Sequence, residues 1–470
     1  MKTIIFWRWR GNLTFMKNYP KTKIVLSSGL ILVILAFICL FLGFYRNQWQ
    51  MARPKKFSVF QKDVESYVIA RLVLSRQAGL LSDGGLLVWG DINPTDVNES
   101  DYQHQYDTYL DGLTFRTHWV KESHPGFQGI FFSLLDRLSP FSPSNNLRFF
   151  RMFASGLFAA VLAGFILWFY WELGKLSAIF VFLSILISQW MTLFGRNLFF
   201  VSGLFYLPAL VLLFRLRGEK TGKDISYGSL FLFVFSLVLI KCLFNGYDFI
   251  LPTLAMTATP IIFYGILEHW DREKFLKRFL TVVIAAIMAI LASLVILSVQ
   301  VAFASGNFQE GINSILQTLN RRTVSNNQSL EPIYQRSSNA STWSILKIYL
   351  SESYLSEFQV PYYAIIALFV IVSIIYFMNN RKGLQPLFPP AKGNALLGAT
   401  WFSLLGPLSW YVIFKSVAYF HTHMNHLPWH MPFTLFGFGL CGFVIENYLT
   451  AKSKIDSKIK LSQSESHSDG

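Results

Sequence analysis

The feature that most constrains this chain is a series of long apolar stretches running from one end to the other. A helix needs about 20 mostly apolar residues to cross the hydrocarbon core of a bilayer. Ten stretches approach this length, and each predicts a transmembrane helix. They cover residues 24–45, 152–173, 176–193, 198–214, 228–243, 249–267, 280–304, 363–378, 396–414 and 431–448. We therefore expect an all-α polytopic membrane protein with about ten transmembrane helices.

The composition excludes the main alternatives to a membrane protein. The chain is 53% hydrophobic, 17% aromatic and 14% charged, whereas soluble domains are about 25% charged. A soluble globule of this composition would expose large apolar patches. Cys39, Cys242 and Cys441 form no CxxC pair, which disfavours a disulfide module and a thiolate–zinc site. In a membrane protein the distribution of Lys and Arg matters more than the net charge of +15, so we expect the lipid bilayer as partner and no nucleic acid.

The distribution of basic residues predicts the topology. The first stretch is long and lacks a cleavage site, so it is interpreted as a signal anchor. Basic residues precede it and follow every even-numbered span, which predicts that both termini are cytoplasmic. We expect an integral protein of the bacterial inner membrane. The cytoplasmic loops are short and carry no phosphate-binding loop, which disfavours an ATP-driven pump.

This topology divides the chain into five segments. They are a basic cytoplasmic N-terminus (1–23), a transmembrane core (24–304) that includes a long outer loop (46–151), a second outer segment (305–362), C-terminal transmembrane helices (363–450) and a disordered cytoplasmic tail (451–470). Chemistry or recognition is therefore expected on the non-cytoplasmic face.

The long outer loop contains two helical patterns. In the first, Asp63 and Glu65 precede apolar residues at helical spacing, and Gly79 is placed to end the helix. Asp63 could equally be a simple N-cap of that helix. In the second, residues 126–138 carry an apolar stripe that predicts an interfacial helix on the outer leaflet. A buried helix of a small outer domain would show the same periodicity.

The order of these features resembles the GT-C superfamily of polytopic glycosyltransferases, which includes protein O-mannosyltransferases and aminoarabinose transferases. The resemblance covers about residues 24–215. It rests on the acidic pair Asp63 and Glu65 after the first span, and on His124 and Pro125 at the start of the second loop helix. Gly126 departs from the second proline common in several of these families. The resemblance implies a polyprenyl-phosphate sugar donor, an acid that activates the acceptor, and His124 as a substrate-binding residue.

Such a transfer needs one base near the acceptor hydroxyl and cations near the leaving phosphate. Asp63 is the first candidate base and Glu65 the second. Arg196, in the turn between spans three and four, and Lys241, near the outer end of span five, are candidate phosphate ligands. Lys241 could instead pair with Asp248.

A histidine cluster lies in the last outer turn, with His421, His423 and His426 at close spacing. These side chains could bind the donor or a lipid phosphate, hold zinc, or belong to the interfacial belt. The sequence indicates no particular cofactor and leaves a divalent metal ion open.

Other functions compete with a sugar transferase. A transporter or flippase of a lipid-linked substrate would show matching broken helices in two halves, and no such pair is evident. An oligosaccharide polymerase or ligase would carry its largest outer loop late in the chain, whereas here it follows the first span. A diverged relative without catalysis is the last alternative.

Overall fold

The computed structural model describes residues 20–92, 98–220, 222, 224–323, 340–355, 359–380, 388–422 and 424–466. Within these ranges, eight helices are long and apolar enough to cross a membrane, counting α16 and α17 as one. They are α1 (Pro20–Arg46), α5 (Pro143–Leu173), α9 (Tyr227–Asn245), α10 (Ile250–Leu267), α11 (Arg272–Ser305), α15 (Tyr362–Asn379), α16 (Pro390–Ser403) with α17 (Leu405–Ile413), and α19 (Phe433–Ser466). The chain is an all-α polytopic membrane protein, as the apolar stretches predict.

Two predicted spans take a different form. The predicted span 176–193 is divided between α6 (Lys175–Leu186) and α7 (Gln189–Phe194). The division falls at Ser188, whose hydroxyl accepts a hydrogen bond from the Met191 N–H at 3.3 Å and so begins the second helix. The predicted span 198–214 corresponds to α8 (Gly203–Glu219), which has 17 residues. The total of ten spans therefore stays a prediction.

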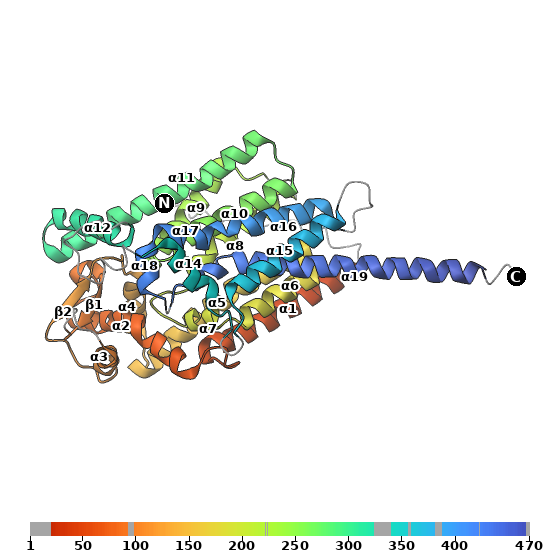
Figure 1. Ribbon diagram of the computed structural model, residues 1–470. Helices are drawn as coiled ribbons and strands as arrows, with labels where there is room; N and C mark the ends of the chain where they lie inside the picture. The colour runs from red at the N-terminus through yellow and green to blue at the C-terminus, as the bar shows by residue number, and fades with distance from the viewer. Residues whose placement is uncertain are drawn as a thin grey trace, which may run out of the picture.

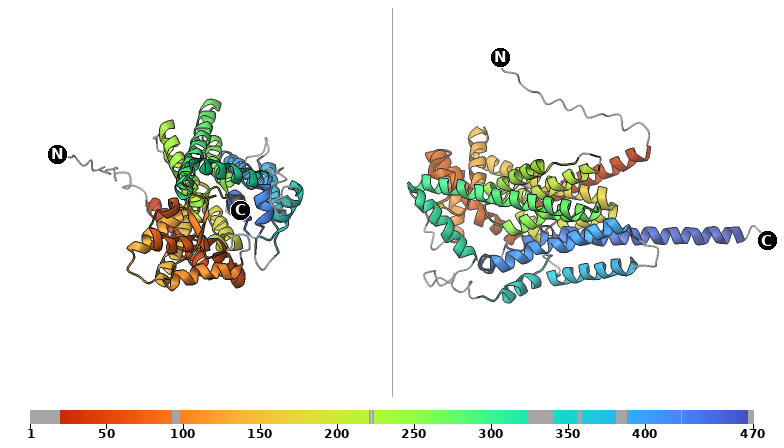
Figure 2. Two further views of the ribbon diagram at one scale, coloured as in Figure 1. Left: turned by 90° about the vertical axis from the view of Figure 1, so that its left-hand side faces the viewer. Right: turned by 90° about the horizontal axis from the view of Figure 1, so that it is seen from above.

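The long helices form a bundle with a shared axis (Figures 1 and 2). Helix α1 packs on α5, α6 packs on α19, α9 packs on α11, and α10 packs on α16 and α8. Outward-facing positions of α11 carry apolar side chains that no neighbouring helix covers. These exposed residues are Leu280, Ile284, Ile287, Met288, Leu291 and Val295. A row of this kind marks a surface that lipid or another protein covers, and it agrees with the assignment of α11 to the bilayer.

The first outer loop folds into a compact assembly at one end of the bundle (Figure 1). Its elements are α2 (Pro54–Ala78), the 3₁₀ turn η2 (Ser82–Gly85), β1 (Leu87–Gly90), α3 (Glu99–Leu110), β2 (His118–Lys121) and α4 (Phe127–Leu138). Strands β1 and β2 pair antiparallel, with Leu87 opposite Lys121 and Gly90 opposite His118. Helix α12 (Phe308–Thr323), from the second outer segment, lies at the same end (Figure 1).

The boundaries of α2 correct one expectation. The helix begins at Pro54 because proline is favoured at the first helical position, so Asp63 lies in its interior and is not an N-cap. The predicted end is confirmed. Gly79 has a φ of 107°, and its N–H donates to the Ser75 carbonyl at 3.1 Å.

Helix α4 forms where the second periodic pattern lies, with Gly126 as its N-cap. Its buried face combines Phe132 with the polar residues Gln128, Ser133 and Asp136, while Leu134 and Leu138 are exposed. The exposed leucines fit a helix whose outer face meets lipid. The interfacial position of α4 stays a prediction.

The C-terminal part of the chain supplies the remaining elements: α14 (Thr342–Ser351), α18 (Lys415–Phe420) and the 3₁₀ turn η3 (Leu427–His430). Helix α19 continues to Ser466, so residues 451–466 are helical in the structure, where the sequence analysis expects a disordered tail. Its Lys, Ser and Asp content suggested disorder, but the segment directly extends a long helix and needs no new helix nucleus. Residues 467–470 lie outside the described ranges.

Short basic loops meet at the opposite end of the bundle. There the carboxylate of the buried Glu172 accepts hydrogen bonds from Arg217 Nη1 at 2.6 Å and from Lys220 Nζ at 2.8 Å. Arg278 pairs with Glu219 at 2.6 Å. Arg217, Lys220 and Arg278, which belong to the basic loops predicted to be cytoplasmic, thus lie at one end of the bundle, away from the assembly formed by the first outer loop.

Candidate functional site

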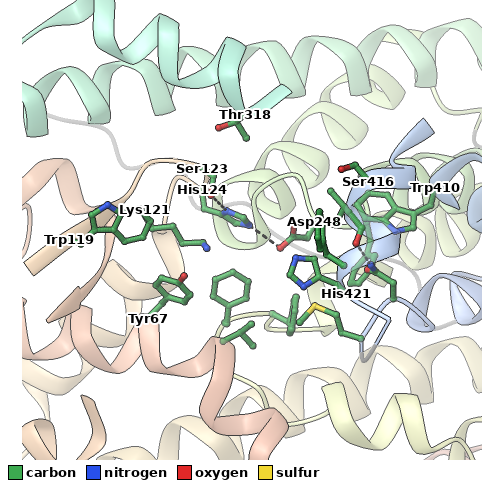
Figure 3. A pocket seen from close by; sticks show the side chains of 18 residues that line it. Tyr67, Trp119, Lys121, Ser123, His124, Asp248, Thr318, Trp410, Ser416 and His421 are labelled. Carbon is green, nitrogen blue, oxygen red and sulfur yellow. Dashed lines mark hydrogen bonds and ion pairs between the residues drawn. The ribbon is translucent and has the colours of Figure 1, made fainter. Parts of the chain in front are cut away.

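A polar cavity of about 350 Å³ lies where the outer-loop assembly meets the bundle (Figure 3). Its wall combines residues of α2, β2, the segment after β2, the α7–α8 connection, the α9–α10 turn, α12, α17 and α18, together with His421, Met424 and Asn425. Aromatic rings form much of the wall: Tyr67, Trp119, Phe199, Phe200, Phe249, Trp410 and Phe420. A concave aromatic wall with a few polar groups is typical of a small-molecule site.

His124 and Asp248 form the central polar pair of this cavity. The Nε2 atom of His124 lies 2.9 Å from Oδ2 of Asp248, and its Nδ1 lies 3.1 Å from the Ser123 hydroxyl oxygen. When Nε2–H donates to the carboxylate, Nδ1 is left as the acceptor for the Ser123 hydroxyl. His124 is 3% exposed, whereas Asp248 is 20% exposed and open to the cavity.

The turn between α9 and α10 places Asp248. Gly246 has a φ of 56°, and a Cβ at this position would lie 2.3 Å from Cδ2 of His124, so glycine is required for the approach. Lys241 Nζ donates to the carbonyl oxygens of Gly246 at 2.9 Å and Asp248 at 2.7 Å. Lys241 is buried behind the turn and does not line the cavity. Its visible role is to hold the backbone that carries Asp248.

Lys121 is the cation that the sequence analysis missed. It ends β2, lines the cavity, and has its Nζ 4.0 Å from the centre of the Tyr67 ring. Tyr67 in turn stacks on Trp89 with ring centres 4.1 Å apart. The alternation of β2 brings Lys121 to the same wall as Trp119. Strand pairing inside a long loop gave no strong sequence signal, because each strand has only four residues.

Glu65 lies in a buried ion pair outside the cavity. Its side chain is fully buried and accepts a hydrogen bond from Arg151 Nε at 2.9 Å and a second one from Arg151 Nη2. The Tyr106 hydroxyl donates to it at 2.9 Å, and the Leu198 N–H donates to the other oxygen at 3.2 Å. Burial, followed by the charge of Glu65, raises the pKa of Tyr106, which therefore stays a hydrogen-bond donor. These four contacts hold the Glu65 carboxylate in place and give it a structural role.

Asp63 is half-buried and does not line the cavity, although its neighbour Val64 does. It is hydrogen-bonded to the side chain of Tyr102 in α3. Burial and then the charge of Asp63 raise the pKa of Tyr102. The predicted meeting of Asp63 with Arg196 or Lys241 in one cavity is not found.

Arg196 also lies away from the cavity. Its guanidinium covers the Phe57 ring at 4.3 Å, and Nη1 donates to the Tyr45 carbonyl at 3.2 Å. Burial, followed by the charge of Arg151, lowers the pKa of Arg196 to about 10. Arg196 therefore belongs to the group around Glu65.

The C-terminal histidines separate in space. His421 lines the cavity (Figure 3), whereas His426 is buried against Trp190 with ring centres 4.2 Å apart. His423 lies outside the described residues. His430, which the prediction omitted, is buried between Ser188 and Tyr362.

The described residues contain no group of three or more His, Cys, Asp or Glu side chains placed to hold a metal ion. His421 and His426 accordingly do not belong to a zinc site within the part of the chain that the structure describes. The divalent metal left open by the sequence finds no ligand set there.

A second cavity, of about 180 Å³, adjoins the first and is apolar. Ser123 and Thr318 line both cavities. The rest of the second wall comes from α10, α11, α12 and their neighbours: Tyr247, Ile250, Leu251, Leu254, Ile290, Leu294, Leu297, Ile315 and Phe414. A polar chamber and an apolar chamber thus meet at two hydroxyl side chains.

Comparisons with protein-family models, with curated proteins and with solved structures gave no match to this chain. Its function is therefore inferred from the residues of the two cavities.

Proposed function

We propose that the protein is a membrane glycosyltransferase that moves a sugar from a polyprenyl-phosphate donor to a lipid, glycan or protein acceptor. The observation that carries this proposal is the junction of the polar and apolar cavities at Ser123 and Thr318. A polyprenyl-phosphate sugar has a polar head joined to a long apolar chain. The two chambers match these two parts in their chemistry and in their order.

The wall of the polar cavity suits a sugar phosphate. Trp119 and Trp410 bring flat apolar faces with polar edges to the wall, which favour a ring that is apolar on its faces and polar at its rim. Lys121 supplies positive charge for the phosphate that leaves as the anomeric C–O bond breaks. A volume of about 350 Å³ falls within the range of small-molecule sites.

The membrane orientation is part of the same proposal. The end of the bundle with Arg217, Lys220 and Arg278 is cytoplasmic, following the positive-inside rule. The cavity at the other end then opens on the non-cytoplasmic face of a bacterial inner membrane, and both termini are cytoplasmic. Sugar acceptors of the cell envelope are available on that face.

A transfer assay with purified protein in lipid vesicles tests the proposal. Wild-type protein is expected to move labelled sugar from at least one polyprenyl-phosphate donor to an acceptor in a membrane extract. Lys121→Ala is expected to reduce the rate by about 10²-fold, because the leaving phosphate loses its cation. Lys55→Ala is the matched control, since Lys55 is an exposed lysine of α2 outside the cavity.

The assay also separates transfer from transport. Movement of the intact lipid-linked sugar between leaflets, with the sugar–phosphate bond unbroken, would contradict the transferase proposal and support a flippase. Equal transfer rates for wild type and Lys121→Ala would contradict the proposal that the leaving phosphate lies beside Lys121 in this cavity.

A further inference from the structure

We propose that Ser123, His124 and Asp248 form a proton relay that receives the proton of the acceptor hydroxyl during sugar transfer. This inference rests on the proposed function and assigns the base of that reaction. The relay takes the place of Asp63 and Glu65 as the expected base. Asp63 does not line the cavity, and Glu65 is held by Arg151 and Tyr106.

The hydrogen bonds of the relay form a continuous chain from Ser123 through His124 to Asp248. The Ser123 hydroxyl lies 3.1 Å from His124 Nδ1, and His124 Nε2 lies 2.9 Å from Asp248 Oδ2. A carboxylate on one imidazole nitrogen fixes the tautomer and favours the protonated ring, while the other nitrogen accepts a proton. Asp248 is the positioning residue, because it acts through His124.

The position of Ser123 connects this relay to the substrate. Ser123 lines both the polar and the apolar cavity, whereas His124 and Asp248 line the polar one. The bond that breaks in a lipid-linked donor lies between its sugar and its phosphate, close to where the apolar chain begins. A donor that fills both chambers therefore presents this bond near Ser123, where an acceptor hydroxyl would be deprotonated.

The step balances with the groups present. The acceptor oxygen forms a bond to the anomeric carbon, and the bond from that carbon to the phosphate oxygen breaks with its electron pair leaving on the phosphate. The acceptor proton passes to the Ser123 oxygen as the Ser123 proton passes to His124 Nδ1. The resulting imidazolium is paired with Asp248 until its proton is released to water, and Lys121 offsets the charge of the free phosphate.

The surroundings hold the relay in place. Lys241 binds the carbonyl oxygens of Gly246 and Asp248, and Gly246 allows the turn to touch the His124 ring. The ring of Phe199 lies 5.3 Å from that of His124 on another side. Restricted rotation of the imidazole keeps Nδ1 directed to Ser123, which a general base requires.

The first test compares variants in the transfer assay. His124→Gln keeps a polar side chain but cannot carry the proton, so its kcat is expected to fall by about 10²- to 10⁴-fold with little change in donor KM. Ser123→Ala is expected to lower kcat, and Ser123→Thr to restore it. His118→Gln is the matched control, because His118 pairs with Asp83 at 3.2 Å outside the cavity.

A second measurement uses the wild-type protein and does not depend on variant folding. In single-turnover transfer across mixtures of light and heavy water, two protons in motion predict a curved dependence of rate on deuterium fraction. A linear dependence, or none, would overturn the relay. So would full activity of His124→Gln.

These outcomes are distinct from failure of the proposed function. Wild-type transfer with an active His124→Gln protein would remove only the relay and leave the transferase proposal standing. Wild-type protein that transfers no sugar from any polyprenyl-phosphate donor would overturn both.

Discussion

At the scale of single residues, two acidic side chains with similar sequence context have different structural roles. Asp63 and Glu65 lie two positions apart on α2, yet only Glu65 is fully buried, in an ion pair with Arg151. The spacing in the sequence could not predict this pair, because Arg151 lies 86 residues away. The base is better sought at His124, which the sequence analysis included only as a substrate ligand.

Glu65→Gln tests the structural role of that carboxylate. The change leaves the Arg151 charge buried without its counter-charge, so we expect a loss of about 3–5 kcal/mol in stability. Thermal unfolding of the purified protein in detergent measures the effect. Asp63→Asn is the control and is expected to cost only about 1 kcal/mol, because its amide can still accept from Tyr102. An unchanged melting temperature for Glu65→Gln would contradict this role.

His430 predicts a dependence of stability on pH. Burial lowers the pKa of His430 from 6.5 to about 3 in the folded protein. The unfolded chain therefore binds the extra proton first. This contribution to stability is complete above pH 6.5 and is lost as the pH falls from there towards 3.

The expected slope is about 1.4 kcal/mol per pH unit within that window. Melting temperatures measured between about pH 7 and about pH 5 should fall for wild type. His430→Gln keeps polar contacts and does not titrate, so its melting temperature should fall less. Parallel curves for the two proteins would count against this assignment.

At the scale of elements, the turn between α9 and α10 fixes the geometry of the site. Gly246→Ala is expected to destabilise the protein by about 1–3 kcal/mol, because alanine is strained at positive φ and its Cβ would meet His124. Transfer activity should fall with it. Gly228→Ala is the control, since a Cβ on Gly228 meets nothing within 4 Å. Melting temperatures and transfer rates of both variants check the prediction, and equal behaviour would contradict it.

Helical elements were easier to predict than their ends and their contacts. Apolar stretches of 16 or more residues predicted the long helices because lipid demands such segments. The sequence pattern places the start of α2 at residue 63, nine residues too late. The helix begins at Pro54, and the acidic pair lies in its interior. Strands β1 and β2 were missed, and with them Lys121, because their pairing depends on contacts distant in the sequence.

At the scale of the whole molecule, the two ends of the bundle differ in kind. One end gathers short basic loops, and the other carries the folded outer-loop assembly and the cavity. In the proposed orientation, which follows the positive-inside rule, the basic end faces the cytoplasm. Reporter fusions at Gly222 and at the C-terminus should report cytoplasm, and one after Asp101 should report the opposite side. A reversal at any of the three would contradict the orientation.

The proposed function requires that one lipid-linked donor occupies both cavities. The most direct measurement is photo-crosslinking with a polyprenyl phosphate that carries a photoreactive group in its apolar chain, followed by mass spectrometry of the labelled residues. We expect labels on Ile290, Leu294 and Ile315, which line the apolar cavity, and we expect unlabelled polyprenyl phosphate to prevent this labelling. Labels confined to Val295, Phe303 and other exposed positions of α11, or labels that unlabelled lipid cannot displace, would contradict it.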